Sequence, residues 1–69
     1  MHTFREVIDQ WGAIDDLAAD IGRKPDTVRK WRQRDRIPSA YWLALLASAR
    51  RRKIAVTQSL LIRLAARDS

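Results

Sequence analysis

A chain of 69 residues is long enough for one small domain, and such a domain buries only about 60% of the surface that its unfolded chain exposes, so we expect help from a partner chain. The absence of cysteine excludes disulfide staples and cysteine-based zinc sites. The net charge of +6 favours a polyanionic partner, and the N-terminal segment lacks the continuous apolar run of a signal peptide, so we expect a cytoplasmic protein.

The positive charge is concentrated in the middle of the chain. Residues 1–22 carry one base and five acids, residues 23–53 carry eleven bases and two acids, and residues 54–69 carry two bases and one acid. A segment as basic as 23–53 favours either nucleic acid or an anionic membrane surface. The longest apolar-rich run, residues 40–49, has about half the length of a membrane span.

The first predicted helix covers residues 4–11. Thr3 followed by Glu6 is the capping-box pattern that starts a helix, and Gly12 readily takes the left-handed conformation that ends one. The apolar residues between them recur at the spacing of one helix face: Phe4, Val7, Ile8 and Trp11. We expect this face to lie in the core.

Two short helices follow, over residues 13–21 and 25–34. The first has its apolar residues at helical spacing and ends at Gly22. Pro25 suits the first position of the second helix because its φ is fixed and it has no N–H to satisfy, whereas Lys24 before it is a poor cap. A tight turn therefore joins the two predicted helices.

The C-terminal third of the chain predicts two more helices. The dipeptide at 37–38 interrupts the pattern before a helix over 39–51, which is apolar almost all round and so is expected to be buried on more than one side. Thr57 can cap a last helix over 58–67, and residues 53–57 form either a linker, which we favour, or a short strand. We expect Trp42, Leu45, Leu46, Leu60, Leu61 and Leu64 in the core, and Leu43 and Ala47 at a dimer interface.

The helix over 25–34 separates apolar from polar residues. If Val28 and Trp31 face the core, the opposite arc mixes cations with carboxylate and amide groups. Arg and Lys donate to guanine, Gln pairs with adenine and Asp accepts from cytosine, so this mixture suits base edges. The candidate base readers are Lys24, Asp26, Arg29, Lys30 and Gln33. Flanking residues suit phosphates, which position a protein without specifying sequence. These candidates are Arg23, Thr27, Arg32, Arg34 and Arg36.

Two charged features of the sequence also have an interpretation that does not involve DNA. Asp26 either accepts from a base or only stabilises the N-terminus of its own helix. The four cations at 50–53 are most simply the favourable positive end of the preceding helix, with phosphate contact as the alternative.

Residues 13–38 resemble the helix-turn-helix of phage repressors of the lambda repressor and Cro type, especially the small Cro-like regulators of prophages. The residues that carry the resemblance are Leu17, Ala18, Gly22, Val28 and Trp31. Ala18 is small where two helices cross closely, and Gly22 permits the backbone angle of the turn. The resemblance implies an all-α, compact bundle of about five short helices in a single domain over 1–69, with its helix-turn-helix core at 13–34.

The expected function is that of a sequence-specific transcriptional regulator of phage or prophage type. It would bind double-stranded DNA as a homodimer at a pseudo-palindromic operator, with the helix over 25–34 in the major groove, and would associate with the nucleoid. No enzyme activity, cofactor, metal or small-molecule substrate is expected, because His2 and the scattered acids lack a second histidine and a glycine-rich phosphate loop.

Two other classes of function remain open. The first is a non-specific architectural DNA binder, against which the mixed polar arc argues. The second is an adaptor that binds an acidic protein through the same basic face. Binding to a membrane surface is a less favoured hypothesis than either of these, because the helix over 25–34 has no continuous apolar face to insert.

Overall fold

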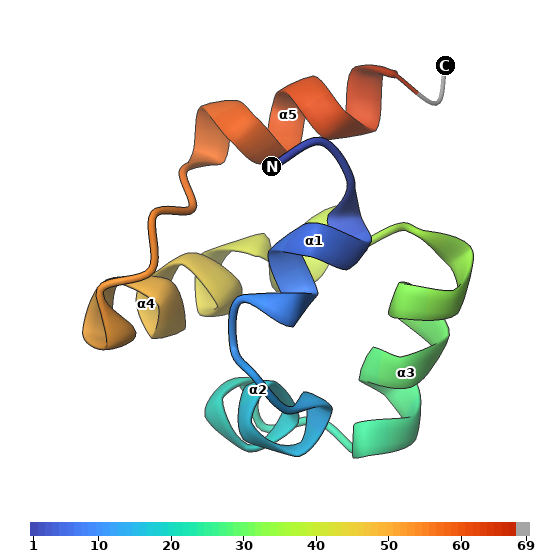
Figure 1. Cartoon of the computed structure of the whole chain (residues 1–69). Coiled ribbons are helices and arrows are strands. Elements are labelled where there is room, and N and C mark those ends of the chain that lie inside the picture. Colours follow the sequence, from blue (N-terminus) through green and yellow to red (C-terminus); the bar gives the residue numbers. More distant parts are fainter. Residues whose placement is uncertain (68–69) are drawn as a thin grey trace.

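The computed structural model describes residues 1–67, which form five α-helices and one turn of 3-10 helix (Figure 1). These elements are α1 (Phe4–Asp9), α2 (Ile14–Ile21), α3 (Pro25–Arg34), η1 (Ser39–Tyr41), α4 (Trp42–Arg52) and α5 (Gln58–Ala66). The described residues contain no strand, so the predicted all-α class is confirmed and residues 54–57 are a linker. The last two residues of the predicted domain lie outside the described range.

The helix α1 begins as predicted and ends two residues early. The Thr3 hydroxyl accepts a hydrogen bond from the Glu6 N–H at 3.1 Å, which is the predicted cap. The N–H groups of Gln10 and Trp11 each bond to a carbonyl three residues back, at 3.2 Å, so the chain tightens into a 3-10 turn instead of continuing the helix. Trp11 is nevertheless buried, as expected.

The bounds of α3 agree with the prediction, and α2 begins one residue later than expected. Pro25 occupies the start of α3, and the Lys24 side chain makes no capping hydrogen bond. The two helices pack closely on each other, and α2 also packs against α4 while α1 packs against α3. Consequently α3 lies at one side of the molecule and the C-terminal end of α4 at the other (Figure 1).

Three helices end with a left-handed residue. Gly22, Asp35 and Lys53 have φ values of 70°, 55° and 59°, and each is followed by a residue whose N–H bonds to the carbonyl five positions back. Glycine takes this conformation without strain, whereas it is uncommon for other residues. The sequence therefore signalled the end of α2 at Gly22 more clearly than the other two ends.

The core draws on all five helices. The four apolar residues of the predicted α2–α3 packing, Leu17, Ala18, Val28 and Trp31, are all buried, as predicted. The α5 leucines at 60, 61 and 64 are buried as well. Their burial fixes which side of α2, α3 and α5 faces inward.

The helix α4 departs most from its prediction. It starts after the 3-10 turn, and of its expected core residues Leu45 is buried while Trp42 and Leu46 are half-buried against the core. Leu43 is 82% exposed and Ala47 is exposed, so the core of the single chain covers only one side of α4, and burial of the other side against a partner stays a prediction. Its apolar second face turns to solvent. Among residues 1–67, no helix is long and apolar enough to cross a membrane.

Candidate nucleic-acid interface

The two sides of α3 differ sharply in exposure. Val28 is fully buried and Trp31 is 6% exposed, so these two residues anchor the helix to the core. All five candidate base readers are exposed: Lys24, Asp26, Arg29, Lys30 and Gln33. The position of the apolar pair therefore turns the mixed polar arc outward, as the helical spacing predicted.

An aromatic stack supports the anchored side of α3. The Trp31 ring lies 4.8 Å from the Tyr41 ring, centroid to centroid, at an interplanar angle of 37°. The Arg23 guanidinium lies over the Tyr41 ring at 4.9 Å from its centroid. Arg23 is thus held beside the start of α3 by an aromatic residue from η1. Helical spacing does not predict this contact, because Tyr41 lies in the 3-10 turn η1 and not on α3.

An ion pair lies on the exposed arc itself. The Arg29 guanidinium contacts the Asp26 carboxylate one turn earlier in α3, and both side chains are exposed. Exposed pairs of this kind contribute little to stability, typically below about 1 kcal/mol, so a ligand group can displace either partner at small cost. The pair holds the Arg29 side chain along the helix surface.

Arg32 points away from the arc and toward α1. Its guanidinium donates two hydrogen bonds to the Asp9 carboxylate, from Nε at 2.9 Å and from Nη2 at 3.2 Å. These hydrogen bonds lower the pKa of the Asp9 carboxyl and raise the pKa of Arg32. Arg32 therefore ties α3 to α1, a role that the sequence did not indicate.

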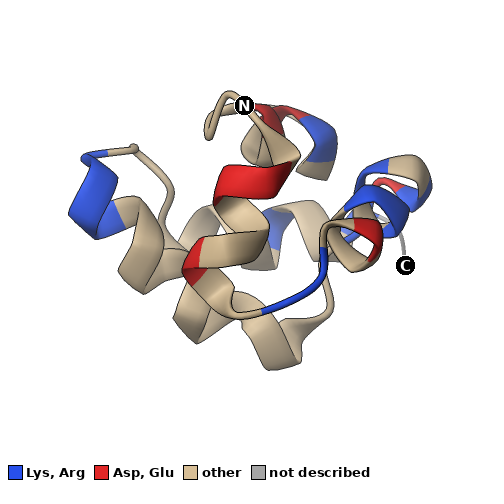
Figure 2. Cartoon of the chain, turned by 90° about the horizontal axis from the view of Figure 1, so that it is seen from below, with Lys and Arg blue, Asp and Glu red and all other residues tan. Residues whose placement is uncertain are grey.

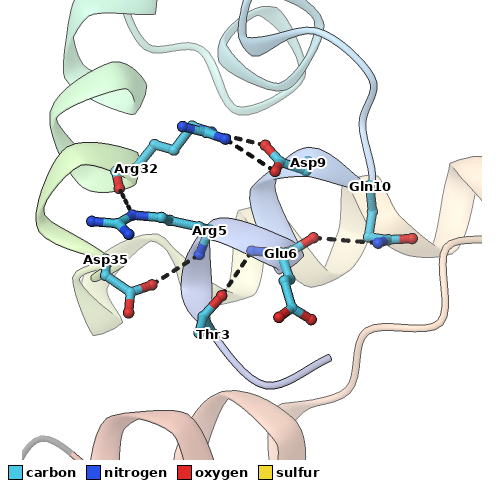
Figure 3. A network of polar contacts seen from close by, with 7 residues as sticks. All are labelled: Thr3, Arg5, Glu6, Asp9, Gln10, Arg32 and Asp35. Carbon is cyan, nitrogen blue, oxygen red and sulfur yellow. Dashed lines mark hydrogen bonds and ion pairs between the residues drawn. The ribbon is translucent and has the colours of Figure 1, made fainter.

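Arg5 caps the C-terminal end of α3 from the neighbouring helix (Figure 3). Its Nε donates to the carbonyl of Arg32 at 2.9 Å and its Nη2 to the carbonyl of Gln33 at 3.2 Å. The Arg5 backbone N–H donates in turn to the Asp35 carboxylate at 3.0 Å. The last carbonyls of a helix lack partners within that helix, so these bonds fix the end of α3.

Together, Arg5, Asp9, Arg32 and Asp35 form what we call the α1–α3 clamp. Arg5 and Asp9 are four residues apart and share one face of α1, and this spacing is the feature of the sequence that relates to the clamp. By itself, however, the spacing suggests an ion pair between Arg5 and Asp9 within one helix, whereas in the fold both side chains contact the neighbouring helix.

The remaining phosphate candidates lie at the two ends of α3. Thr27 is half-buried in its first turn, and Arg34 and Arg36 are exposed at and beyond its last turn. Among residues 1–67, neither of these two arginines takes part in an ion pair. Their guanidinium groups are thus available to bind an anion near the C-terminal end of α3.

A second polar network lies between α1, α2 and α4. The Trp11 indole N–H donates to the buried Ser48 hydroxyl at 2.8 Å, and that hydroxyl donates to the Asp20 carboxylate at 2.6 Å. Arg52 donates to the same carboxylate from Nε at 2.5 Å and from Nη2 at 3.2 Å. Hydrogen bonds from Arg52 and Ser48 lower the pKa of Asp20 to about 2. The network fixes α4 to α2. The sequence does not predict it, because Ser48 lies within an apolar-rich run.

The charges form separate zones on the molecule. Seen from the side of α2 in Figure 2, basic segments along α3 and at the end of α4 lie on opposite sides of the acidic segments of α2. The acids at the start of α2, Asp15 and Asp16, are exposed.

Residues 1–67 contain no group of three or more potential metal ligands. No protein-family model, curated protein or solved structure matches the chain.

Proposed function

We propose that this protein is a sequence-specific DNA-binding transcriptional regulator of the phage or prophage type, acting at the nucleoid. The observation that carries the proposal is the division of α3 into a buried apolar side and an exposed arc of mixed hydrogen-bonding groups. An α-helix fits the major groove of B-form DNA, where each base pair presents a distinct pattern of donors and acceptors. A uniformly cationic arc would meet phosphates equally well but would not distinguish these patterns.

The arrangement of α2 and α3 supports a helix-turn-helix mode of binding. The two helices pack on each other, their residues Leu17, Ala18 and Val28 are buried, and the left-handed Gly22 begins the short turn between them. In this mode the second helix lies in the major groove with its N-terminal residues at the base edges. Lys24 and Asp26 would then lie deepest in the groove.

The contacts divide the candidate residues by role. We assign base edges to all five candidate readers on the exposed arc, and the Asp26 carboxylate also orients Arg29 until a base takes its place. Arg34 and Arg36, together with Arg23 and Thr27, are assigned to phosphates. Because the Arg32 guanidinium already binds Asp9, we expect Arg32 to contribute less to phosphate binding than Arg34 does.

A homodimer on a pseudo-palindromic operator completes the proposal. Leu43 and Ala47 lie one turn apart on the exposed side of α4 and offer an apolar strip for a second copy. Two copies would read half-sites about one helical turn of DNA apart, roughly 34–36 Å. Such an interface would also bury the apolar face that the single chain leaves in solvent.

Selection of bound sequences from a random pool of DNA duplexes at physiological salt tests the proposal. We expect enrichment of one inverted repeat. Enrichment of no sequence, despite binding, would indicate an architectural protein, and no binding even at low salt would indicate the adaptor. With roughly six to eight phosphate contacts, the affinity should fall by several powers of ten over a few-fold rise in salt.

Two substitutions test the assignment of roles. Arg29→Ala should relax preference at one base position by about 1–3 kcal/mol, whereas Arg34→Ala should weaken all sequences alike and reduce the salt slope by about one per copy. Arg63→Ala, an exposed change on α5, serves as the control and should leave both quantities unchanged. Equal effects of Arg29→Ala and Arg34→Ala on operator and random DNA would contradict the division into base and phosphate contacts.

A further inference from the structure

The C-terminal end of α4 carries four consecutive cations, Arg50 to Lys53, that the proposed function does not use. Arg52 binds the Asp20 carboxylate and belongs to the polar network between the helices. Arg50, Arg51 and Lys53 are exposed, and within residues 1–67 none of them takes part in an ion pair. We call these three residues the α4 patch.

The backbone at Lys53 is unusual for a lysine. Its φ of 59° is left-handed, a conformation that glycine adopts freely and that is uncommon for a long side chain. The other non-glycine residue in this conformation, Asp35, has a local reason, because its carboxylate accepts the Arg5 N–H. Lys53 ends α4 where glycine would suit the backbone better.

The chemistry of the α4 patch fits a phosphate backbone better than an acidic protein. Protein interfaces are anchored by apolar or aromatic side chains in a dry centre. The exposed residues that follow the patch are small or polar: Ala55, Thr57, Gln58 and Ser59. The exposed apolar residues that precede it on α4, Leu43 and Ala47, are assigned above to the second copy of the chain. No carboxylate or amide is interleaved among the cations, so the patch has no means of reading base edges.

An acidic surface separates the α4 patch from a duplex bound by α3. The arc of α3 faces away from the core at one side of the molecule, and the patch lies at the opposite side, beyond the acidic α2 (Figures 1 and 2). A single duplex in contact with both would have to cross the exposed carboxylates of Asp15 and Asp16, which repel phosphates. We therefore expect a phosphate backbone on the patch to belong to a different duplex segment from the one on α3.

We propose that Arg50, Arg51 and Lys53 form a second, sequence-independent site for the phosphates of duplex nucleic acid, so that one protein bridges two duplex segments. The bridging part rests on the proposed function, because α3 holds the first segment. The patch itself does not, since its cations and their exposure are independent of what α3 binds.

A capture assay with the full chain tests bridging. Operator duplex is fixed to beads, protein is added, and a labelled duplex of unrelated sequence is captured from solution at about 50 mM salt. The double variant Arg50→Gln with Arg51→Gln should capture about tenfold less labelled duplex while its affinity for operator alone, measured by fluorescence anisotropy, is unchanged. Arg63→Gln with Arg67→Gln removes the same charge from α5 and the residue after it, at the cost of the Arg67 hydrogen bond to the His2 carbonyl, and should capture as the unmodified protein does.

A second background separates the patch from α3. In the exposed triple variant Arg29→Ala, Lys30→Ala and Gln33→Ala, operator preference should disappear while weak duplex binding at low salt persists. Adding the patch substitutions should weaken that residual binding about tenfold and lower its salt slope by about two, while the remaining phosphate contacts beside α3 still hold some duplex. If the triple variant keeps full operator binding, the proposed function is contradicted. The effect of adding the patch substitutions to that variant still tests the patch.

Two results would overturn the inference. One is equal capture and equal residual binding by the patch variant and the α5 control. The other is displacement of duplex from the triple variant by poly-L-glutamate at lower charge concentration than by competing duplex, which would reassign the patch to an acidic protein.

Discussion

The two most basic regions of the molecule, α3 and the end of α4, are built alike and differ in what they present. Each contains four cations, and each commits one arginine to a carboxylate on another helix: Arg32 to Asp9, and Arg52 to Asp20. On α3 the remaining cations share the surface with Asp26 and Gln33, whereas the end of α4 presents cations alone. A run of arginines in a sequence thus contains both structural and free members, and only their tertiary partners distinguish them.

The anchors of the two regions also differ in depth. The Asp9–Arg32 pair lies at the surface, where solvent weakens it, with the Asp9 side chain 51% exposed. The Asp20 side chain is 19% exposed and also accepts from the fully buried Ser48, which in turn satisfies the Trp11 indole. We therefore expect the α4 anchor to matter more for stability, and the α1–α3 clamp to matter more for the orientation of α3.

Removing the apolar anchor of α3 should cause the greatest loss of stability. Trp31→Ala should lower the free energy of unfolding by about 3–5 kcal/mol, because a buried indole and its stacking on Tyr41 are lost. Urea denaturation followed by circular dichroism measures it. Arg63→Ala, an exposed change on α5, should change stability by less than about 0.5 kcal/mol. A loss of similar size from both variants would mean that α3 is not held by its apolar side.

Next in size is the difference between the two anchors. Asp20→Asn should cost about 1–3 kcal/mol, because the Ser48 hydroxyl loses its charged acceptor in a buried setting. Asp9→Asn, the matched change in the exposed pair, should cost less than about 1 kcal/mol. Thermal unfolding of both variants checks the ranking. A greater loss from Asp9→Asn would reverse our view of which anchor is structural.

The acid dependence of stability should follow the same carboxyl group. The pKa of Asp20 in the fold is about 2, below the ordinary value of 3.8, so the ionised form is favoured by folding. Its contribution is complete above about pH 4 and is lost as the pH falls through 2. Urea midpoints measured between pH 5 and pH 2 should therefore fall less steeply for Asp20→Asn than for the unmodified protein. Parallel curves would show that Asp20 is not stabilised in the fold.

The smallest effect concerns the left-handed residues that end the two regions. Lys53→Gly should raise the free energy of unfolding by about 1 kcal/mol by relieving backbone strain, which corresponds to roughly 4–8 °C in Tm. Asp35→Gly should bring a smaller gain or none, because it also removes the acceptor of the Arg5 N–H. Equal gains would indicate that the Asp35 hydrogen bond contributes nothing.

Much of the fold was predictable because its determinants are local. The spacing of Val28 and Trp31 identified the inward side of α3, Pro25 marked its first residue, and Gly22 marked the end of α2. The exposure of the candidate base readers followed from the same periodicity. The end of α1 was misplaced by two residues because the tightening of its last turn leaves the apolar spacing unchanged.

Helical periodicity and capping act within a few residues, so the amino-acid order alone shows which residues of each helix turn inward. Which charged groups meet depends instead on the packed fold: Arg5 with the end of α3, Arg32 with Asp9, and Arg52 with Asp20. These partners are more than twenty residues apart in the chain, and their meeting depends on how whole helices pack. Burial is a property of one helix face, whereas an ion pair between helices requires the relative position of two.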